Sequence, residues 1–332
     1  MTPRCAVLDD YQDVALSMAD WSALAGAVDV RTLRQPFRSE DEVVAAIGDC
    51  EIVVAMRERT PFPASLLARL PRLRLLITSG MRNAAIDLEA AAQHGVTVCG
   101  TASNTEPPVE LTWALILGLA RSVVTESAAM RAGGPWQSTL GADLHGRTLG
   151  LLGLGKIGTR VARIGQAFGM NVTAWSQNLT AERAAEEGVH AAATKDELVE
   201  TSDFVSVHLV LGDRTRGLLG AGELRRMRPT AYLVNTSRAA IVDQPALLRA
   251  LRENWIAGAG LDVFDHEPLP ADHPLRTLPN VLALPHLGYV TRRNYEGYFQ
   301  QAVEDITAFL AGSPIRQLGR SEPACGMGRS AG

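Results

Sequence analysis

Short apolar runs alternate with helical patterns along most of the chain, and this alternation constrains the fold more than any other feature. In the first hundred residues, runs such as EIVVAM and LRLLITSG are separated by segments with apolar residues at helical spacing, such as PASLLARL. A second series begins near residue 148, where near-continuous apolar runs such as TLGLL and AYLVN are typical of strands buried on both faces. Strand–helix alternation of this kind predicts parallel sheets with crossover helices.

A length of 332 residues is enough for about two domains. We expect an α/β protein with two Rossmann-like, doubly wound parallel-sheet domains and a cleft between them. The outer, flavodoxin-like domain is expected to hold residues 1–102 plus 291–317, and the inner, dinucleotide-binding domain residues 103–290. Residues 318–332 are small, polar and glycine-rich, and predict a disordered tail.

Two helices are expected outside the strand series. One long helix is predicted over 110–133, because Glu110 begins an apolar pattern that ends at the Gly133–Gly134–Pro135 sequence. A final amphipathic helix is predicted over 294–311.

Composition excludes several classes of function. The net charge is -4 and aromatic residues make up 5% of the chain, so nucleic acid is not an expected partner. Aspartates occur by residue 10, too early for a signal peptide, and the apolar segment LTWALILGLA is about half a membrane span. We therefore expect a cytoplasmic protein with no membrane partner. The four cysteines have no CxxC or metal-like spacing and are expected to be free thiols, with no metal site.

The motif GLGKIG at 153–158 has the GxGxxG spacing of a dinucleotide site. It follows the predicted strand TLGLL and opens a predicted helix, which is the context that the motif requires. Gly153 is expected to make the tight turn, Gly155 to let a pyrophosphate approach the backbone, and Gly158 to let helix pack on strand. The start of the helix then supplies amides and a partial positive charge to the phosphates.

The acidic residue that should hold the ribose hydroxyls about 20 positions further on is missing. No acid occurs from 170 to 181, and Ser176 and Gln177 stand at the end of the second strand of this domain. They can hydrogen-bond a hydroxyl or a phosphate, and no arginine stands among them. The cofactor is therefore NAD or NADP, with a slight preference for NADP.

Three further motifs each place one polar side chain just after a predicted buried strand. They are NTSRAAIVD with Arg238, DVFDHEP with Glu267, and LPHLG with His286. Reduction of a 2-oxo acid needs a proton donor, and an imidazolium suits this role because histidine titrates near neutral pH. A carboxylate such as Glu267 favours the imidazolium, and a guanidinium such as Arg238 can orient the substrate carboxylate and polarise its carbonyl group. These three are the predicted catalytic residues.

The motifs LHGRTLGLLGLGKIG, LRRMRPTAYLVNTSRAAIVD, GAGLDVFDHEP and LPHLGYVT resemble those of the D-isomer-specific 2-hydroxyacid dehydrogenases, over roughly 45–317. This resemblance implies an NAD(P)-dependent enzyme that interconverts a 2-oxo acid and a D-2-hydroxy acid. It implies that Asp262 binds the nicotinamide carboxamide and that His208 lines the cofactor site. Besides the three glycines of GLGKIG, the residues expected to contact the cofactor are Lys156, Ile157, Ser176, Gln177, His208, Thr236, Asp262 and Gly288.

The family holds the substrate carboxylate on a glycine-rich loop, which here is SGMRN with Gly80, Met81 and Arg82. Arg82 replaces a second glycine of the family, and Arg57 ends the preceding strand on the same side. If either arginine points inward, the substrate carries a second anionic group. The resemblance also implies a homodimer, formed through the long helix and the segment after it. The alternative function is a dinucleotide-sensing binding protein similar to the C-terminal-binding-protein corepressors, which keep the same three catalytic residues.

Overall fold

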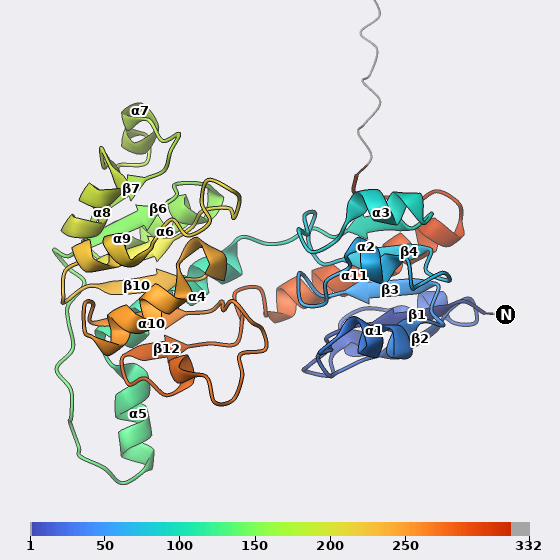
Figure 1. Cartoon of the computed structure of the whole chain (residues 1–332), viewed down its shortest axis with the longest axis horizontal. Coiled ribbons are helices and arrows are strands. Elements are labelled where there is room, and N and C mark those ends of the chain that lie inside the picture. The colour runs from blue at the N-terminus through green and yellow to red at the C-terminus, as the bar shows by residue number, and fades with distance from the viewer. Residues whose placement is uncertain (1, 320–332) are drawn as a thin grey trace, which may run out of the picture. The chain divides into compact units, whose positions relative to one another are not determined.

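The computed structural model describes residues 2–319, and the chain divides into two compact units (Figure 1). Unit 1 holds the chain up to Asn104 together with the chain from Thr291, and unit 2 is Thr105–Val290. Each unit is built on a parallel sheet with helices packed on it. The predicted α/β class with two parallel-sheet domains is confirmed.

Unit 1 contains a five-stranded sheet in the order β2-β1-β3-β4-β5, in which every pair is parallel. This is the flavodoxin-like order, as predicted for the outer domain. The strands are β1 (Arg4–Val7), β2 (Asp29–Thr32), β3 (Ile52–Ala55), β4 (Leu75–Thr78) and β5 (Thr97–Gly100).

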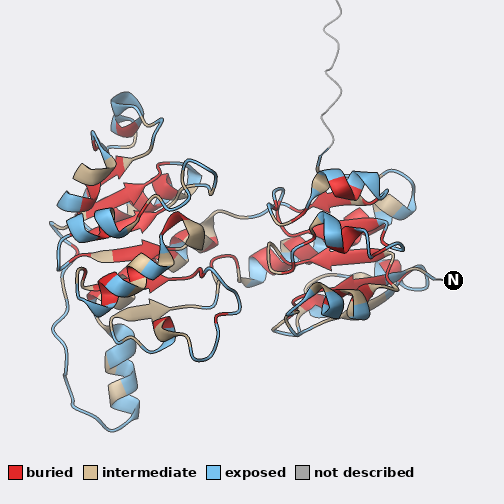
Figure 2. Ribbon diagram, in the orientation of Figure 1, coloured by how far each residue is buried: buried red, intermediate tan, exposed pale blue. Residues whose placement is uncertain are grey.

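Helices cover both faces of the unit 1 sheet. One apolar core joins alternate strand residues to α1 (Glu40–Ile47), α2 (Ala64–Leu67) and α3 (Leu88–Gln93). On the opposite face, α11 (Arg292–Leu310) packs against β4 and against a short 3-10 helix, Trp21–Leu24. In Figure 2 the buried strands therefore lie between helices whose outer faces are exposed.

Unit 2 contains a seven-stranded parallel sheet in the order β12-β11-β10-β9-β6-β7-β8. The order reverses between β6 and β9, and this is the switch point at which open α/β sheets bind ligands, beyond the carboxyl ends of the strands. The strands are β6 (Thr148–Leu152), β7 (Asn171–Trp175), β8 (His190–Ala191), β9 (Phe204–Val207), β10 (Tyr232–Asn235), β11 (Gly258–Leu261) and β12 (Val281–Ala283).

Two apolar cores fill the two faces of the unit 2 sheet. The first joins the strands to α4 (Glu106–Ala120), α6 (Lys156–Ala167) and α7 (Ala181–Ala185). The second joins them to α8 (Lys195–Thr201), α9 (Ala221–Arg226) and α10 (Gln244–Arg252). The remaining elements are α5 (Val123–Arg131) and the 3-10 helices Ala15–Ser17, Ala239–Ile241 and Pro274–Arg276.

The prediction of a single helix over 110–133 is wrong. The chain forms α4 and α5, which meet at an angle of 65°, and Ser122 between them has φ 50° in the left-handed region. Packing explains the break, because α4 carries seven buried residues whereas α5 carries none. α4 also starts before Glu110, since Pro107 and Pro108 are tolerated in the first turn of a helix, where their missing N–H groups are not needed.

The end of the chain returns to unit 1. α11 begins and ends within two residues of the predicted 294–311, and Leu318 donates its backbone N–H to the carbonyl of Val98 in β5 at 2.8 Å. The predicted tail thus starts in a segment that still bonds to the sheet, and its residues 320–332 lie outside the described residues, as does Cys325. Cys5, Cys50 and Cys99 are free and buried. No single helix within residues 2–319 is long and apolar enough to cross a membrane, although α4 and α5 pass that test together as a bent pair.

Candidate active site

The three glycines of GLGKIG lie at the switch point of the unit 2 sheet. Gly153 follows β6 with φ 105°, and a Cβ there would lie 2.8 Å from the carbonyl oxygen of His208, at the end of β9. A Cβ on Gly158 would lie 2.1 Å from the carbonyl oxygen of Gly153. These two positions therefore require glycine for the backbone to turn and for α6 to pack on the strand.

Gly155 differs from its neighbours, because a Cβ built there meets nothing within 4 Å. Gly155 is the N-cap residue of α6, so the open space above it faces the unpaired N–H groups of the first helical turn. A pyrophosphate needs this combination of open approach and aligned N–H donors. The residues present thus fit the phosphates of a dinucleotide.

A cavity of about 430 Å³ opens beside Gly155, and four of its lining residues are cations. It is lined by Thr105, Leu154, Gly155, Lys156, Thr159, Arg160, Arg163 and Arg183. Of these, Gly155 and Lys156 were predicted at the cofactor site, and the three arginines were not. Two of the three arginines could have been found from the sequence. The spacing is four residues from Lys156 to Arg160 and three from Arg160 to Arg163, so these side chains share one face of α6.

The other predicted cofactor residues occupy several positions around the switch point. Ser176 and Gln177 follow β7 directly, where Ser176 is half-buried and Gln177 is exposed. Ile157 packs against the core around α4 and α6. Thr236, after β10, exchanges a hydrogen bond of 2.8 Å with the hydroxyl of Thr112 in α4.

His208 directly follows β9, and its Nε2 lies 2.9 Å from the hydroxyl of Ser206. Burial lowers the pKa of His208 to about 4, so the imidazole is neutral at pH 7. A neutral, hydrogen-bonded histidine suits a position beside a ligand and does not suit proton donation.

His286 and Glu267 form a contact pair, as predicted for a proton donor and its carboxylate. Nδ1 of His286 lies 2.6 Å from Oε2 of Glu267, and Oε1 of Glu267 accepts a bond of 2.9 Å from the N–H of Phe264. The two side chains are 18% and 28% exposed, so solvent reaches the pair only in part. Because Nδ1 faces the carboxylate, Nε2 is the ring nitrogen that can serve a substrate.

The backbone holds His286 in an unusual conformation. Its φ is 54°, in the left-handed region, and such residues concentrate at functional sites. Its ring meets the ring of Tyr289 edge-on, with 5.5 Å between centroids.

Asp262, which directly follows β11, anchors the turn that follows His286. Its side chain is fully buried, and its two oxygens accept from the N–H groups of Leu287 at 2.6 Å and Gly288 at 2.8 Å. Burial raises the pKa of Asp262 to about 6, while these two N–H groups favour its charged form. The carboxylate predicted to bind nicotinamide thus also positions the segment that carries His286. A Cβ on Gly288 would lie 3.1 Å from the aspartate oxygen, a tight contact that favours glycine at this position.

Arg238 stands three residues after β10, in a turn organised by Asn235. The amide of Asn235 donates to the carbonyl of Arg238 at 3.1 Å and accepts from the N–H of Ser237 at 3.0 Å. The carbonyl of Asn235 also accepts from the N–H of Asp262 at 3.0 Å, which couples this turn to the end of β11. The three predicted catalytic side chains are therefore carried beyond the carboxyl ends of three adjacent strands, β10, β11 and β12.

The predicted substrate residues lie at the carboxyl edge of the unit 1 sheet. Arg57 follows β3 with φ 54° and a side chain only 18% exposed, and its Nη1 donates to the carbonyl of Ser79 at 2.9 Å. A Cβ on Gly80 would lie 2.0 Å from that Nη1, so the guanidinium rests directly on the glycine. Met81 and Arg82 are exposed. Of the two arginines predicted near the substrate, Arg57 packs on the loop and Arg82 does not.

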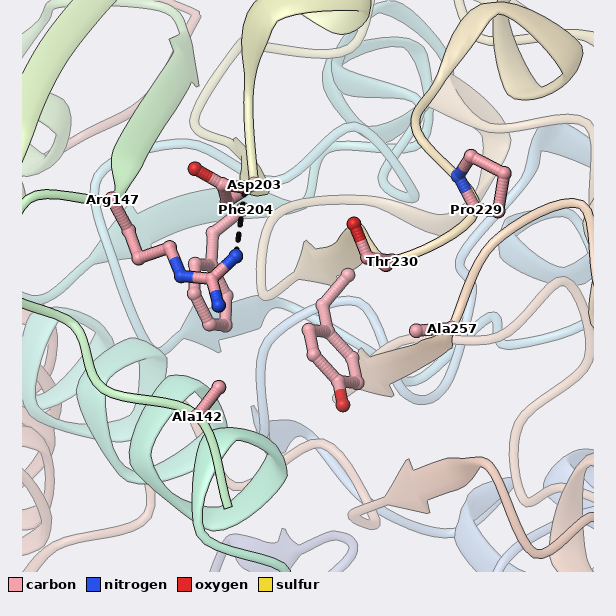
Figure 3. A pocket seen from close by; sticks show the side chains of 8 residues that line it. Ala142, Arg147, Asp203, Phe204, Pro229, Thr230 and Ala257 are labelled. Carbon is pink, nitrogen blue, oxygen red and sulfur yellow. Dashed lines mark hydrogen bonds and ion pairs between the residues drawn. The ribbon is translucent and has the colours of Figure 1, made fainter. Parts of the chain in front are cut away.

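A second cavity, of about 290 Å³, lies at the opposite edge of the unit 2 sheet. Arg147 reaches Asp203 (Figure 3), and Nη1 of Arg147 lies 3.2 Å from the carboxylate. The same carboxylate pairs with Arg228 at 3.2 Å, and the rings of Phe204 and Tyr232 stack with 5.4 Å between centroids. These residues precede or begin their strands, whereas parallel sheets bind ligands beyond the carboxyl ends. The cavity lies at the end of the sheet away from Gly155 and His286. Across residues 2–319, no group of three histidine, cysteine or acidic side chains could hold a metal ion.

Comparison with known proteins agrees with this arrangement. Residues 113–288 match the model of the D-isomer specific 2-hydroxyacid dehydrogenase NAD-binding domain. The chain is 44% identical over 256 residues to a glyoxylate reductase of Aeropyrum pernix, covering 74% of this chain and 76% of that protein. The chain belongs to this dehydrogenase family.

Two further matches extend the comparison. A D-3-phosphoglycerate dehydrogenase of Methanocaldococcus jannaschii is 32% identical over 86% of this chain and 56% of its own length. A crystal structure of a phosphoglycerate oxidoreductase from Vibrio cholerae O395 is 39% identical, with a TM-score of 0.90, and the match covers 94% of this chain and all of that one. The protein is therefore an oxidoreductase, a D-2-hydroxyacid dehydrogenase that uses a nicotinamide dinucleotide. None of these relatives is named as a corepressor, so the alternative of a dinucleotide-sensing binding protein gains no support from them.

Proposed function

We propose that this dehydrogenase reduces a small 2-oxo acid with a second anionic group to the D-2-hydroxy acid, and that His286, Glu267 and Arg238 carry the chemistry. The observation that carries the assignment of roles is the contact of 2.6 Å between Nδ1 of His286 and Oε2 of Glu267. In the same proposal, unit 2 is the dinucleotide-binding domain and unit 1 the substrate domain.

The proposed roles follow from the groups present. The bound dinucleotide supplies the hydride. His286 donates the proton to the substrate's carbonyl oxygen from Nε2, and the resulting neutral ring keeps its bond to Glu267. Arg238 presents a planar fork to the substrate carboxylate and carbonyl group, which orients the acid and polarises the bond that is reduced. Asp262 keeps the turn after His286 in place, so that the ring does not have to be ordered at the moment of reaction.

A substrate panel tests the proposal. We expect oxidation of NADPH or NADH with 2-oxo acids and a product of D configuration, which chiral chromatography would identify. The panel should contain glyoxylate, pyruvate, hydroxypyruvate and 3-phosphohydroxypyruvate, because the relatives include a glyoxylate reductase and a D-3-phosphoglycerate dehydrogenase. An L product, or no oxidation with any 2-oxo acid, would overturn the proposal.

Glu267→Gln should reduce kcat for reduction of the best 2-oxo acid by about one to two decades, because a charge-assisted hydrogen bond worth roughly 1.5–3 kcal/mol is lost. The carboxylate holds Nδ1 of His286 at 2.6 Å, and a neutral amide replaces that bond with a weaker one. The matched control is Glu253→Gln, which alters a surface ion pair with Arg249. Near-normal kcat in Glu267→Gln would remove Glu267 from the proposed mechanism.

Arg57→Ala should reduce kcat/KM for a 2-oxo acid with a second anionic group. We expect the half-buried guanidinium, which lies against Gly80, to pair with such a group. A charge-assisted hydrogen bond is worth roughly 1.5–3 kcal/mol, or about one to two decades. Glyoxylate, which lacks the group, should lose little. Arg82→Ala is the matched control, since Arg82 is exposed on the same loop. Equal losses for 3-phosphohydroxypyruvate and glyoxylate would show that Arg57 only shapes the loop, and the preference for a dianionic substrate would be withdrawn.

A homodimer is the proposed assembly. α5 has no buried residue (Figure 2). Large apolar side chains are exposed on α5 and on the segment after it. They are Val123, Val124, Met130, Trp136 and Leu140, with exposures from 53% to 99%. Apolar side chains exposed this densely are typical of an interface between chains.

Sedimentation equilibrium should therefore give about twice the chain mass of 35.5 kDa. The double substitution Val124→Glu and Met130→Glu should shift the mass to that of one chain. A single-chain mass for the unmodified protein would contradict the proposal.

A cytoplasmic location remains a prediction from the sequence.

A further inference from the structure

Four of the eight residues that line the cavity beside Gly155 are cations, namely Lys156, Arg160, Arg163 and Arg183. Each arginine is held by an acid outside that lining: Arg160 by Glu106 at 2.8 Å, Arg163 by Glu187 at 2.8 Å, and Arg183 by Glu186 and Glu187 at 3.0 and 3.1 Å. A pyrophosphate inside a dinucleotide is bound largely by the N–H groups at the start of α6. The guanidinium groups fixed at this cavity can therefore serve a further phosphate group.

Arg163 and Arg183 come from different helices and are held together by one acid. Glu187 accepts from Nε and Nη2 of Arg163 at 3.1 and 2.8 Å, and from Nη1 of Arg183 at 3.1 Å. Its side chain is only 10% exposed, whereas those of the two arginines are 65% and 47% exposed. Glu187 therefore fixes two guanidinium groups on one side of the cavity while leaving both accessible.

Arg183 is placed where the adenosine ribose of a dinucleotide is recognised. In this fold, the side chain that selects between a ribose hydroxyl and a phosphate follows the second strand of the nucleotide-binding domain, here β7. Ser176 and Gln177 occupy that position without an acidic group, so nothing there repels a phosphate. The chain then enters α7, whose N-cap is Thr180, and Arg183 lies in the first turn of that helix.

We infer that Arg183, positioned by Glu187 together with Arg163, binds the 2′-phosphate of NADP and makes the enzyme selective for NADPH. This inference rests on the proposed dinucleotide site at Gly155 and adds a selecting residue to it. The planar guanidinium offers paired N–H donors that match phosphate oxygens. An enzyme for NADH would instead need an acid after β7 to hold the ribose hydroxyls, and the chain has none from 170 to 181.

Equilibrium binding of the reduced dinucleotides, followed by their fluorescence, tests the inference without relying on activity. The unmodified protein should bind NADPH at least about tenfold more tightly than NADH. Arg183→Ala should weaken NADPH binding by about ten- to a hundredfold, the value of a charge-assisted hydrogen bond or two, and leave NADH binding unchanged. Arg163→Ala should shift the same ratio in the same direction. Arg252→Ala, on an exposed position of α10 that does not line the cavity, is the matched control.

A competition experiment separates the phosphate from the rest of the dinucleotide. Adenosine 2′,5′-bisphosphate should displace NADPH more effectively than 5′-AMP from the unmodified protein, and this difference should be smaller for Arg183→Ala. Tighter binding of NADH than of NADPH by the unmodified protein, or equal weakening of both dinucleotides by Arg183→Ala, would overturn the inference and leave the dinucleotide site standing. Failure of the unmodified protein to bind either dinucleotide would overturn the proposed function itself.

Discussion

His286→Ala should reduce kcat for reduction of the best 2-oxo acid by roughly 10²–10⁴-fold, the usual contribution of a general acid. The substitution removes the ring whose Nδ1 lies 2.6 Å from Glu267 and whose Nε2 is proposed to donate the proton. Dinucleotide affinity should stay the same, because the phosphate-binding glycines follow β6, whereas His286 follows β12. Stopped-flow measurement of the first turnover would show the loss in the chemical step itself.

A loss of activity must be separated from a change in the backbone. His286 has φ 54°, and alanine is less easily accommodated there than asparagine, which tolerates the left-handed region. His286→Asn therefore serves as the second variant, since it keeps the conformation and cannot donate a proton as an imidazolium does. Both variants should lose activity to a similar extent. Near-normal kcat in either one would remove His286 from the mechanism.

Gly155→Val should weaken binding of both NADPH and NADH by about a hundredfold or more, because a branched side chain would occupy the space that the pyrophosphate needs. Loss of two charge-assisted hydrogen bonds from the first turn of α6 accounts for an effect of that size, at roughly 1.5–3 kcal/mol each. The position makes an unusually clean test. A Cβ there meets no protein atom within 4 Å, and its φ of -86° suits any residue.

The two neighbouring glycines do not offer the same test. At Gly153 and Gly158 a Cβ would collide with backbone oxygens, so substitutions there would disturb the fold together with the site. The matched control is Gly222→Val, at an exposed position of α9 where a Cβ also meets nothing within 4 Å. Unchanged dinucleotide affinity in Gly155→Val, measured by the same fluorescence titration, would contradict the placement of the pyrophosphate.

Much of the architecture could be predicted because it depends on local sequence. Strands buried on both faces need nearly continuous apolar runs, and the runs EIVVAM, LRLLITSG, TLGLL and AYLVN correctly predicted β3, β4, β6 and β10. Parallel pairing then follows from the intervening helices, and the carboxyl ends of parallel strands meet at one edge. For this reason Arg238, Glu267 and His286 could be assigned to one edge of one sheet before any distance was known.

Other features depend on contacts between residues far apart in the sequence. The break at Ser122 arises because α4 is buried in the core of unit 2 and α5 is not, a difference that the continuous helical pattern of 110–133 does not contain. The side chain of Arg57 packs on the loop after β4, whereas that of Arg82 is exposed. This difference depends on how the ends of β3 and β4 lie beside each other.

The sequence by itself determined the fold class, the dinucleotide motif and the identity of the three proposed catalytic residues, because each of these depends on residue type and spacing along the chain. Only the tertiary structure decided which side chains touch. The fold brings His286 into contact with Glu267, 19 residues away in the sequence. It also joins Arg183 and Arg163 through their shared partner Glu187, at the cavity beside Gly155. The physical reason is that the register of neighbouring strands and the packing of helices on the sheet set the direction of each side chain, and neither is encoded in any short segment of the sequence.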